Sequence, residues 1–322
     1  MTPVVSVIIP AWNAAAYIDE ALASVSAQTL AEWEALVIDD ASSDDTAERI
    51  MAVAARDPRF RLLRQDRNAG PSTARNRGID EARGRYVALL DADDVYAPTR
   101  LAQMVALAER HGSEMASDNL WLLPEGDPGA ARAMIPLTVL DGERALTLAE
   151  FIARNVADPA HPGLNFGFLK PVILREFLVT NAIRYDERVR FAEDFALYVD
   201  CFSAGARWWI SSASTYTYRV RAASLTQIQT VHDLSLLRAK LSGLIEQAGA
   251  TGNLTLAGAV RRQARIVDRC YHYRAFTDHI KARRFGTALT ELSGSGRAAS
   301  LILEETFRQL PTIARKAARG GY

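Results

Sequence analysis

The chain has 322 residues, 49% of them hydrophobic, and its 38 Lys and Arg residues balance 38 Asp and Glu residues. This length and composition exclude an intrinsically disordered chain and a small disulfide-stapled protein, and they predict one large globular domain with an appendage. The two cysteines, Cys201 and Cys270, are too few for a disulfide framework and match no zinc motif, so we expect both to be buried thiols.

Strands and helices are predicted to alternate along the first hundred residues. Each predicted strand is followed by a helical pattern. In the first of these patterns the apolar residues at helical spacing are Ile18, Ala21, Leu22 and Val25. The next three helices are predicted from their start signals. These are the capping residues at 42–45, a Gly-Pro turn in 68–84 and Pro98 in a first turn. Such alternation is typical of an α/β fold with a mostly parallel sheet. The strands are predicted at four apolar runs: residues 4–10, 34–40, 60–64 and 85–90.

The second half of the chain shows a looser pattern. Residues 124–136, rich in Pro, Gly and Ala, predict a surface loop. From about residue 229 onward the pattern is helical, and its leucines form one apolar stripe at Leu234, Leu237, Leu241 and Leu244. Between these two regions we expect helices around 147–155 and 192–205, and strands at 207–210 and 214–220.

Polar side chains end several of the predicted strands. In parallel sheets, ligands bind beyond the carboxyl ends of the strands, so these residues are expected to meet at one rim. Two carboxylates about 4 Å apart repel each other by roughly 4 kcal/mol at an effective dielectric near 20, and we therefore expect a cation among them. Three clusters are involved: Trp12 with Asn13, Asp39 with Asp40, and Asp91 with Asp93 and Asp94.

The Asp91-x-Asp93 pair suits a divalent cation, because Mg²⁺ and Mn²⁺ prefer oxygen ligands and Mg²⁺ is typically held by one or two carboxylates plus substrate phosphates. The alternative interpretation is that these aspartates only initiate a turn and cap the following helix. Arg75 has the planar fork that recognises a phosphate, although it also suits a surface salt bridge. Trp12 is expected either to stack on a base or to pack in the core.

Glu193 and Asp194 form a second acidic pair, at the start of a predicted helix. One reading is a general base with a second carboxylate beside it. The other is an acidic pair favoured at the helix N-terminus by the macrodipole.

Several motifs then carry a resemblance. SVIIPAWNAAAYIDEALASVSAQTL, VIDDASSDDT, RNAGPSTARNRGIDEARGRYVALLDADD and FAEDFALYVDCFSAG resemble, in order and spacing, the successive motifs of the family 2 inverting glycosyltransferases. SDNL and LNFGFLKPVILREFL are similar to segments of the succinoglycan-type exopolysaccharide glucosyltransferases, whose acceptors are lipid-linked oligosaccharides. The resemblance implies the GT-A fold, a Rossmann-like mostly parallel sheet flanked by helices. It implies a GT-A domain over 1–225, with a nucleotide-sugar-binding half (1–123) and an acceptor-side half (124–225), and a helical basic extension over 226–322.

The resemblance also implies residue roles. Asp93 becomes the principal ligand of a divalent metal, Mg²⁺ or Mn²⁺, with Asp91 shared between metal and sugar nucleotide. Asp194 becomes the general base, with Glu193 beside it. The expected substrate-binding residues are Pro10, Trp12, Asn13, Asp39 or Asp40 at the uracil, Arg75 near the diphosphate, Asp91 and Asn165.

The reaction implied is transfer of a single hexose, with glucose favoured, from a UDP-sugar to a polyprenyl-diphosphate-linked oligosaccharide in bacterial exopolysaccharide biosynthesis. It would proceed with inversion, by metal-assisted single displacement. The Gln-x-x-Arg-Trp motif of polymerising members does not follow residue 194 in the sequence, which argues against a processive synthase.

Other functions remain as alternatives. A phosphoacceptor signalling module also places aspartates at strand ends, but such modules are much shorter than this chain. A Mg²⁺-dependent phosphatase of the Asp-nucleophile type would carry Asp-x-Asp after its first strand, where this chain has Pro10-Ala11-Trp12-Asn13. A family 2 transferase acting on lipopolysaccharide or capsule is the third alternative.

The charge is unevenly distributed along the chain. Residues 261–322 hold thirteen Lys and Arg against five Asp and Glu, a net charge of +8, which leaves −8 on the preceding 260 residues. Since no apolar run is long enough to span a bilayer and no signal peptide is recognised, we expect a cytoplasmic protein that is peripheral on the inner face of the cell membrane. A solvated helix face is the alternative, and nucleic acid is not an expected partner. The basic residues proposed for contact are Arg261, Arg262, Arg265, Arg269, Lys281, Arg283 and Arg284.

Overall fold

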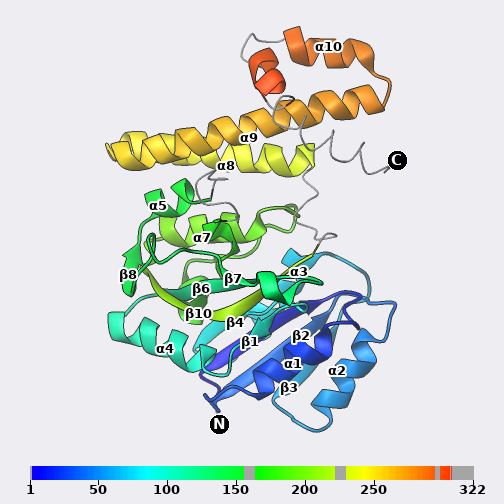
Figure 1. The fold of residues 1–322 in the computed structure, drawn as a ribbon, viewed down its shortest axis with the longest axis vertical. Coiled ribbons are helices and arrows are strands. Elements are labelled where there is room, and N and C mark those ends of the chain that lie inside the picture. The colour runs from blue at the N-terminus through cyan, green and yellow to red at the C-terminus, as the bar shows by residue number, and fades with distance from the viewer. Residues whose placement is uncertain (1, 156–163, 222–229, 294–297, 305, 307–322) are drawn as a thin grey trace. The chain divides into compact units, whose positions relative to one another are not determined.

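A computed structural model describes residues 2–155, 164–221, 230–293, 298–304 and 306 (Figure 1). The chain divides into two compact units, Met1–Leu225 and Thr226–Tyr322. Each unit is described by itself below.

The first unit is built on a ten-stranded sheet with the order β3-β2-β1-β4-β9-β6-β10-β5, in which β7 pairs with β6 and β8 with β10. The β1–β2, β1–β4, β2–β3 and β6–β10 pairs are parallel, which confirms the predicted mostly parallel α/β sheet. The antiparallel strands are β5, β7, β8 and β9. The strand bounds are β1 Val5–Ala11, β2 Trp33–Asp39, β3 Phe60–Arg64, β4 Tyr86–Leu89, β5 Val95–Tyr96, β6 Met115–Pro124, β7 Arg132–Ala133, β8 Glu143–Leu146, β9 Val172–Leu174 and β10 Trp208–Val220.

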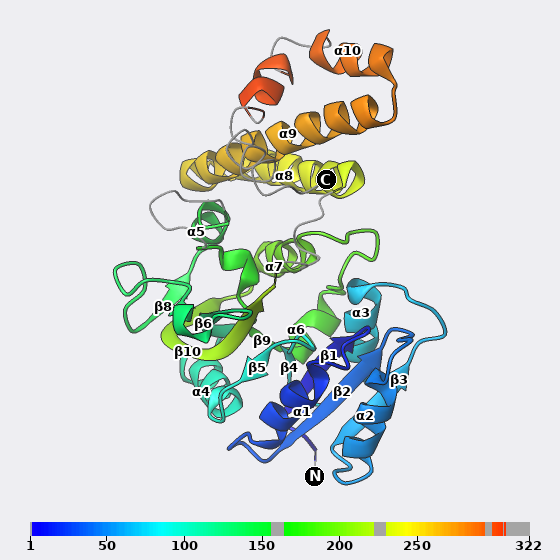
Figure 2. The ribbon, with the colours of Figure 1, turned by 45° about the vertical axis from the view of Figure 1, so that its right-hand side comes forward.

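Helices cover the sheet, as Figures 1 and 2 show. The helix α3 lies especially close to β1: a Cβ at Gly78 would be 2.4 Å from Cγ2 of Ile8. Glycine is therefore required sterically there, and this close contact fixes the helix that carries Arg75. The helices of the first unit are α1 Ile18–Ser26, α2 Thr46–Ala54, α3 Pro71–Glu81, α4 Arg100–His111, α5 Leu148–Ala153, α6 Arg175–Thr180 and α7 Glu193–Ser203, with 3₁₀ turns η1 Pro128–Ala130 and η2 Phe166–Phe168.

The core of this unit contains a charged pair as well as apolar side chains. Every residue of β2 is buried, as a strand covered on both faces requires. Arg100 on α4 forms a buried salt bridge with Asp118 on β6. Asp118 also accepts a hydrogen bond from the backbone N–H of Thr215 (2.6 Å), and Arg100 donates one to the carbonyl of Lys170 (2.6 Å). This network joins α4, β6 and β10 and holds the backbone of Lys170 in place.

Several local expectations were wrong in detail. Pro98 lies before α4, whose N-cap is Thr99, because the short strand β5 occupies Val95–Tyr96. The segments 207–210 and 214–220 belong to one strand, β10, whose register against β6 shifts between Ser211 and Tyr216. A β-bulge of this kind lets a strand continue through residues that break its alternation. The predicted loop 124–136 contains η1 and β7, which pairs with β6.

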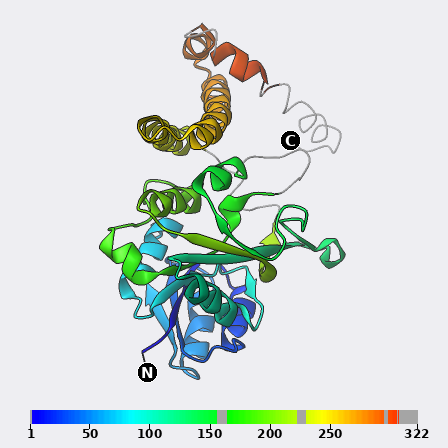
Figure 3. The same ribbon diagram turned by 90° about the vertical axis from the view of Figure 1, so that its left-hand side faces the viewer.

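The second unit contains the helices α8 Val231–Ala250, α9 Leu254–Lys281 and α10 Phe285–Ser293. The predicted leucine stripe of α8 is confirmed, since Leu234, Leu237, Leu241 and Leu244 are all buried. The helices α8 and α9 pack side by side, which Figure 3 shows nearly end-on. Within the part of the chain that the structure describes, no helix is both long and apolar enough to cross a bilayer.

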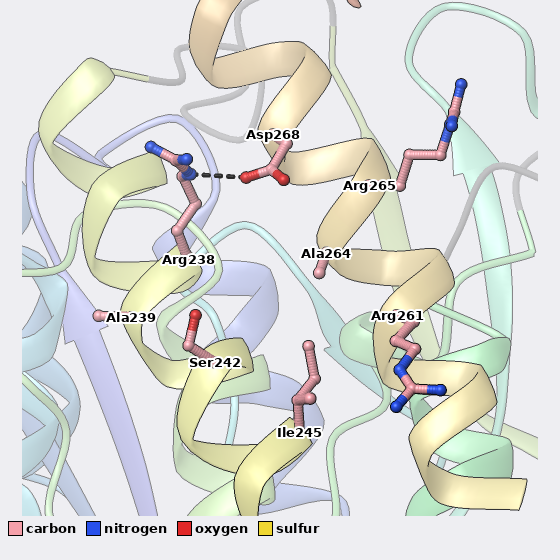
Figure 4. Close-up of a pocket in the computed structure, with 8 residues that line it drawn as sticks. All are labelled: Arg238, Ala239, Ser242, Ile245, Arg261, Ala264, Arg265 and Asp268. Atoms are coloured by element: carbon pink, nitrogen blue, oxygen red, sulfur yellow. Dashed lines mark hydrogen bonds and ion pairs between the residues drawn. The ribbon is translucent and has the colours of Figure 1, made fainter. Parts of the chain in front are cut away.

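A groove runs between α8 and α9 (Figure 4). Arg238 of α8 donates to Asp268 of α9 across it (2.7 Å), and Arg265 pairs with Glu304 (2.7 Å). Arg269, expected on the exposed basic face, is instead buried, so it is not part of an accessible basic surface. Cys201 is buried as expected, but Cys270 is partly exposed.

Candidate active site

The candidate site lies where β4 ends and α7 begins. Asp91 and Asp93 follow β4, Arg75 comes from α3, and Glu193 is the first residue of α7. Asp91 and Asp93 lie beyond the carboxyl end of β4, as predicted. Arg75 and Glu193 come to them from helices that are distant in the sequence.

Arg75 holds three of the acidic residues together. Its guanidinium contacts Asp91 (2.9 Å), Glu193 (2.7 Å) and Asp194 (3.7 Å), and its side chain is only 5% exposed. The alternative of a surface salt bridge is therefore wrong, because the pair network is buried. Arg75 links the carboxylate after β4 to the acidic pair of α7.

Lys170 is a second cation at this site and was not identified from the sequence. Its ammonium lies 2.9 Å from Asp91 and 2.7 Å from Asp194, and its side chain is 4% exposed. Burial lowers the pKa of Lys170, but the charges of Asp194 and Asp91 outweigh it, so the net pKa lies well above its usual value. The only sequence signal was an isolated lysine in the apolar segment 164–174.

The two carboxyls of the acidic pair have opposite pKa shifts. Burial raises the pKa of Asp194, but Arg75 and Lys170 outweigh it, and the net pKa is lowered. The pKa of Glu193 is raised, mainly by burial. Asp194 also accepts a hydrogen bond from the hydroxyl of Tyr185 (2.9 Å). Asp194 is thus held ionised at neutral pH, whereas Glu193 ionises less readily.

The three aspartates after β4 differ in their surroundings. Asp94 accepts hydrogen bonds from the hydroxyl of Tyr216 (2.6 Å) and the backbone N–H of Arg219 (2.8 Å), so it joins the segment after β4 to β10. No aspartate caps α4, whose N-cap is Thr99, and that part of the alternative interpretation is wrong. Asp93 pairs with Arg221 (2.8 Å). The pKa of Asp93 is raised, first by burial and then by the charge of Asp91.

The residues fit a divalent cation bound together with a substrate. Within the described ranges, no group of three or more His, Cys, Asp and Glu side chains is arranged to hold a metal by itself. Asp91 and Asp93 supply two carboxylates, which is the number Mg²⁺ commonly takes from a protein when substrate phosphates complete its shell. The side chains of Asp91 and Asp93 are 22% and 32% exposed, so a dication can reach both carboxylates from the rim.

The residues expected at the uracil lie at the end of β2. Asp40 accepts hydrogen bonds from the backbone N–H groups of Ala69 and Gly70 (both 2.8 Å). Asp39 is fully buried and accepts from Ser42 N–H (3.1 Å) and Arg64 (3.3 Å). Both carboxylates thus have roles in ordering the loops of this rim.

Trp12 and Asn13 follow β1 at the same rim. The side chain of Trp12 is 51% exposed, so the core alternative is wrong and its ring is accessible. Asn13 has a φ of 48° and its side-chain oxygen accepts from the backbone N–H of Ser43 (2.9 Å). Pro10 lies within β1, opposite Ile38 of β2.

On the expected acceptor side, Asn165 accepts a hydrogen bond from Gly167 N–H (2.8 Å) and so caps η2. Phe166 and Trp208 are buried in the core. Asn165 therefore orders the turn that leads to Lys170.

Comparisons with known proteins agree with this architecture. The sequence profile of "Glycosyl transferase family 2" matches residues 6–151. The chain is 37% identical over 226 residues to succinoglycan biosynthesis protein ExoO of Rhizobium meliloti, covering 70% of this chain and 63% of ExoO. It is 32% identical over 284 residues to succinoglycan biosynthesis protein ExoU of the same organism, covering 88% of this chain and 81% of ExoU.

Among solved structures, S. aureus TarS 1-349 in complex with UDP-GlcNAc matches with a TM-score of 0.67 and 18% identity, over 95% of this chain and 91% of that one. An identity this low supports the fold alone, and the expected GT-A architecture is confirmed. The chain spans less than two thirds of the length of ExoO.

Proposed function

This chain belongs to glycosyl transferase family 2, and we propose that it transfers a single hexose from a UDP-sugar to a polyprenyl-diphosphate-linked oligosaccharide, with inversion. The observation that carries the proposal is the buried network in which Arg75 and Lys170 each join Asp91 to Asp194. In this proposal Asp91 serves the donor and Asp194 the acceptor, and the network holds the two carboxylates close together. The names of ExoO and ExoU support exopolysaccharide synthesis as the pathway, and glucose is the sugar that the sequence resemblance favours.

The donor would lie along the rim formed by the ends of β1, β2 and β4. Trp12 offers an accessible ring for a base, and Asp39 or Asp40 is the proposed partner of uracil. TarS binds UDP-GlcNAc in a fold of this kind, which supports a UDP-sugar as the donor. Asp93 and Asp91 would hold Mg²⁺ or Mn²⁺ at the diphosphate, and the cation would offset the charge that develops on the leaving group.

Asp194 is the proposed general base. In single displacement it takes the proton of the acceptor hydroxyl, whose oxygen bonds to the anomeric carbon while the bond from that carbon to the diphosphate oxygen breaks. A carboxylate offers about four lone-pair positions. The hydrogen bonds from Tyr185 and Lys170 therefore leave Asp194 able to accept a further hydrogen bond from the acceptor hydroxyl. Its lowered pKa keeps it ionised for this step. Glu193 would orient sugar hydroxyls.

Calorimetry and turnover assays separate the two roles. Asp93→Asn should abolish metal-supported binding of UDP-glucose, whereas Asp194→Asn should keep donor affinity and lose about 10²- to 10⁴-fold in turnover. Asp80→Asn is the matched control, because Asp80 is a 61% exposed carboxylate that pairs with Arg184 at the surface. Unchanged turnover in Asp194→Asn would refute the base assignment, and unchanged donor binding in Asp93→Asn would refute the metal assignment.

The lipid-linked acceptor implies a site of action at the inner face of the cell membrane. The net charge of +8 on residues 261–322 supports attraction of the basic helices to an anionic bilayer. Thin-layer separation of a radiolabelled lipid-linked oligosaccharide after incubation with UDP-glucose tests the acceptor. Label that stays entirely in the water-soluble fraction would contradict it.

A further inference from the structure

The corner between α9 and α10 leaves apolar side chains exposed. Phe285 and Leu289 of α10 are 58% and 63% exposed, and they lie four residues apart on one face of that helix. Leu292 continues the stripe and is half-buried. Ala288, at the edge of the same face, is buried as α10 packs against α9 (Figures 1 and 2). The apolar face of α10 is thus wider than its contact with α9.

Three basic residues precede this stripe in the sequence. Lys281, Arg283 and Arg284 are all exposed, and in the described part of the chain none of them has an acidic partner. The turn that presents them is well defined: the N–H groups of Arg283 and Arg284 donate to the carbonyls of Ile280 (3.0 Å) and His279 (2.9 Å). This pair of bonds is the Schellman arrangement that ends a helix.

The groove between α8 and α9 is a weaker candidate for an anionic partner. Two of the arginines that line it, Arg238 and Arg265, are already paired with Asp268 and Glu304. A phosphate would have to break these ion pairs, whereas the cations beside α10 need no such exchange.

We propose that the α9–α10 corner, formed by Lys281, Arg283, Arg284, Phe285 and Leu289, is the surface that binds an anionic lipid bilayer. Apolar side chains flanked by basic residues are the combination that holds an amphipathic helix in the interface of a membrane. Phe285 and Leu289 enter the acyl boundary, and the three cations contact lipid phosphates. This inference deepens the proposed function, on which it rests, by assigning the membrane contact to one surface.

Cosedimentation of the full chain with vesicles tests the surface. With vesicles of phosphatidylglycerol and phosphatidylcholine, the double variant Phe285→Ser/Leu289→Ser should bind at least about tenfold more weakly than the wild type. Leu254→Ser is the matched control, because Leu254 is 84% exposed at the opposite end of α9. With 28 residues, α9 separates the two positions by about 42 Å, so the control should bind as the wild type does.

Charge reversal tests the basic part of the surface. Arg283→Glu/Arg284→Glu should lose more vesicle binding than Arg261→Glu/Arg262→Glu. The second pair makes the same change of charge at exposed positions within α9, away from the corner. Binding to vesicles of phosphatidylcholine alone should be weak for every variant. Equal losses for the two double reversals would overturn the assignment, because they would indicate attraction by the overall charge.

A tryptophan at the corner gives an independent measurement. The five natural tryptophans all precede residue 210, so Phe285→Trp adds the first one to the second unit. Its added fluorescence should be quenched by brominated lipid in vesicles. Absence of that quenching would overturn the proposal. A double serine variant that binds vesicles normally but sediments as a smaller species in solution would also overturn it, because a second copy of the chain would then cover this surface.

These outcomes are separable from the proposed function. Each variant should bind UDP-glucose as the wild type does, because the changes lie outside the nucleotide-binding unit. Normal vesicle binding by the double serine variant with active transfer would overturn only the membrane surface. Corner-dependent vesicle binding without any transfer from UDP-glucose would overturn only the proposed function.

Discussion

Lys170 offers the sharpest test of the charge network, because its removal leaves two buried carboxylates with one cation fewer. Lys170→Met keeps a side chain of similar length and deletes the contacts to Asp91 (2.9 Å) and Asp194 (2.7 Å). Removing one partner of a buried ion pair typically costs about 3–5 kcal/mol. Arg75 still contacts both carboxylates, so we expect a loss of about 3 kcal/mol, the lower end of that range.

The matched control is Arg85→Met, which removes a cation whose side chain is 61% exposed and pairs with Glu109. Exposed pairs contribute about 0–1 kcal/mol. Urea unfolding followed by tryptophan fluorescence measures both, and because all five tryptophans lie in the first unit the signal reports that unit alone. A loss in Lys170→Met no larger than that in Arg85→Met would refute the reasoning.

The pH dependence of this difference has a definite sign. The pKa values of Asp91 and Asp194 are lowered in the folded chain, so their ion pairs stabilise it above the usual aspartate pKa, and that contribution is lost as pH falls through the folded values. The pKa of Lys170 is raised in the folded chain, so the stability that its charge contributes is complete below the usual lysine pKa and is lost only at higher pH. The stability gap between wild type and Lys170→Met should therefore be full near pH 7 and shrink below about pH 4.

Two further predictions concern the neighbouring residues. Arg221→Ala should raise the affinity for Mn²⁺ measured by paramagnetic resonance without donor, because Arg221 neutralises Asp93 in the free chain; an unchanged or weaker affinity would contradict this. Gly78→Ala should destabilise the first unit by about 1–3 kcal/mol in the same urea assay, because its Cβ would be 2.4 Å from Ile8. Gly129→Ala, in the same unit, is the control, because its Cβ would meet only Asp127 at an ordinary 3.5 Å; equal losses would refute the packing argument.

The order of strands and helices in the first half was predictable because it depends on local patterns. The run 60–64 coincides with β3, and the leucine stripe of α8 follows from helical periodicity. The parallel pairing of these strands was predictable from their alternation with helices, whereas their order in the sheet was not predicted. Positions at strand ends, such as Asp91 and Asp93, could therefore be assigned to one rim.

The rest of the site depends on contacts between distant segments. Lys170 reaches Asp91 only because β9 inserts between β4 and β6, and nothing local in its sequence indicates that pairing. The support of Asp94 by Tyr216 joins residues 122 positions apart. The sequence resemblance supplied roles for individual aspartates, but it did not indicate which of them the chain's own cations already neutralise.

The measurement that tests the central claim most directly is thermal unfolding with UDP-glucose after removal of metal by EDTA, with and without added Mn²⁺. Asp91 and Asp93 should bind the donor diphosphate only through a dication. With Mn²⁺, donor at about 100 times its dissociation constant should stabilise the chain by about 2.7 kcal/mol, and without metal it should give no shift. An equal shift in EDTA would contradict the account.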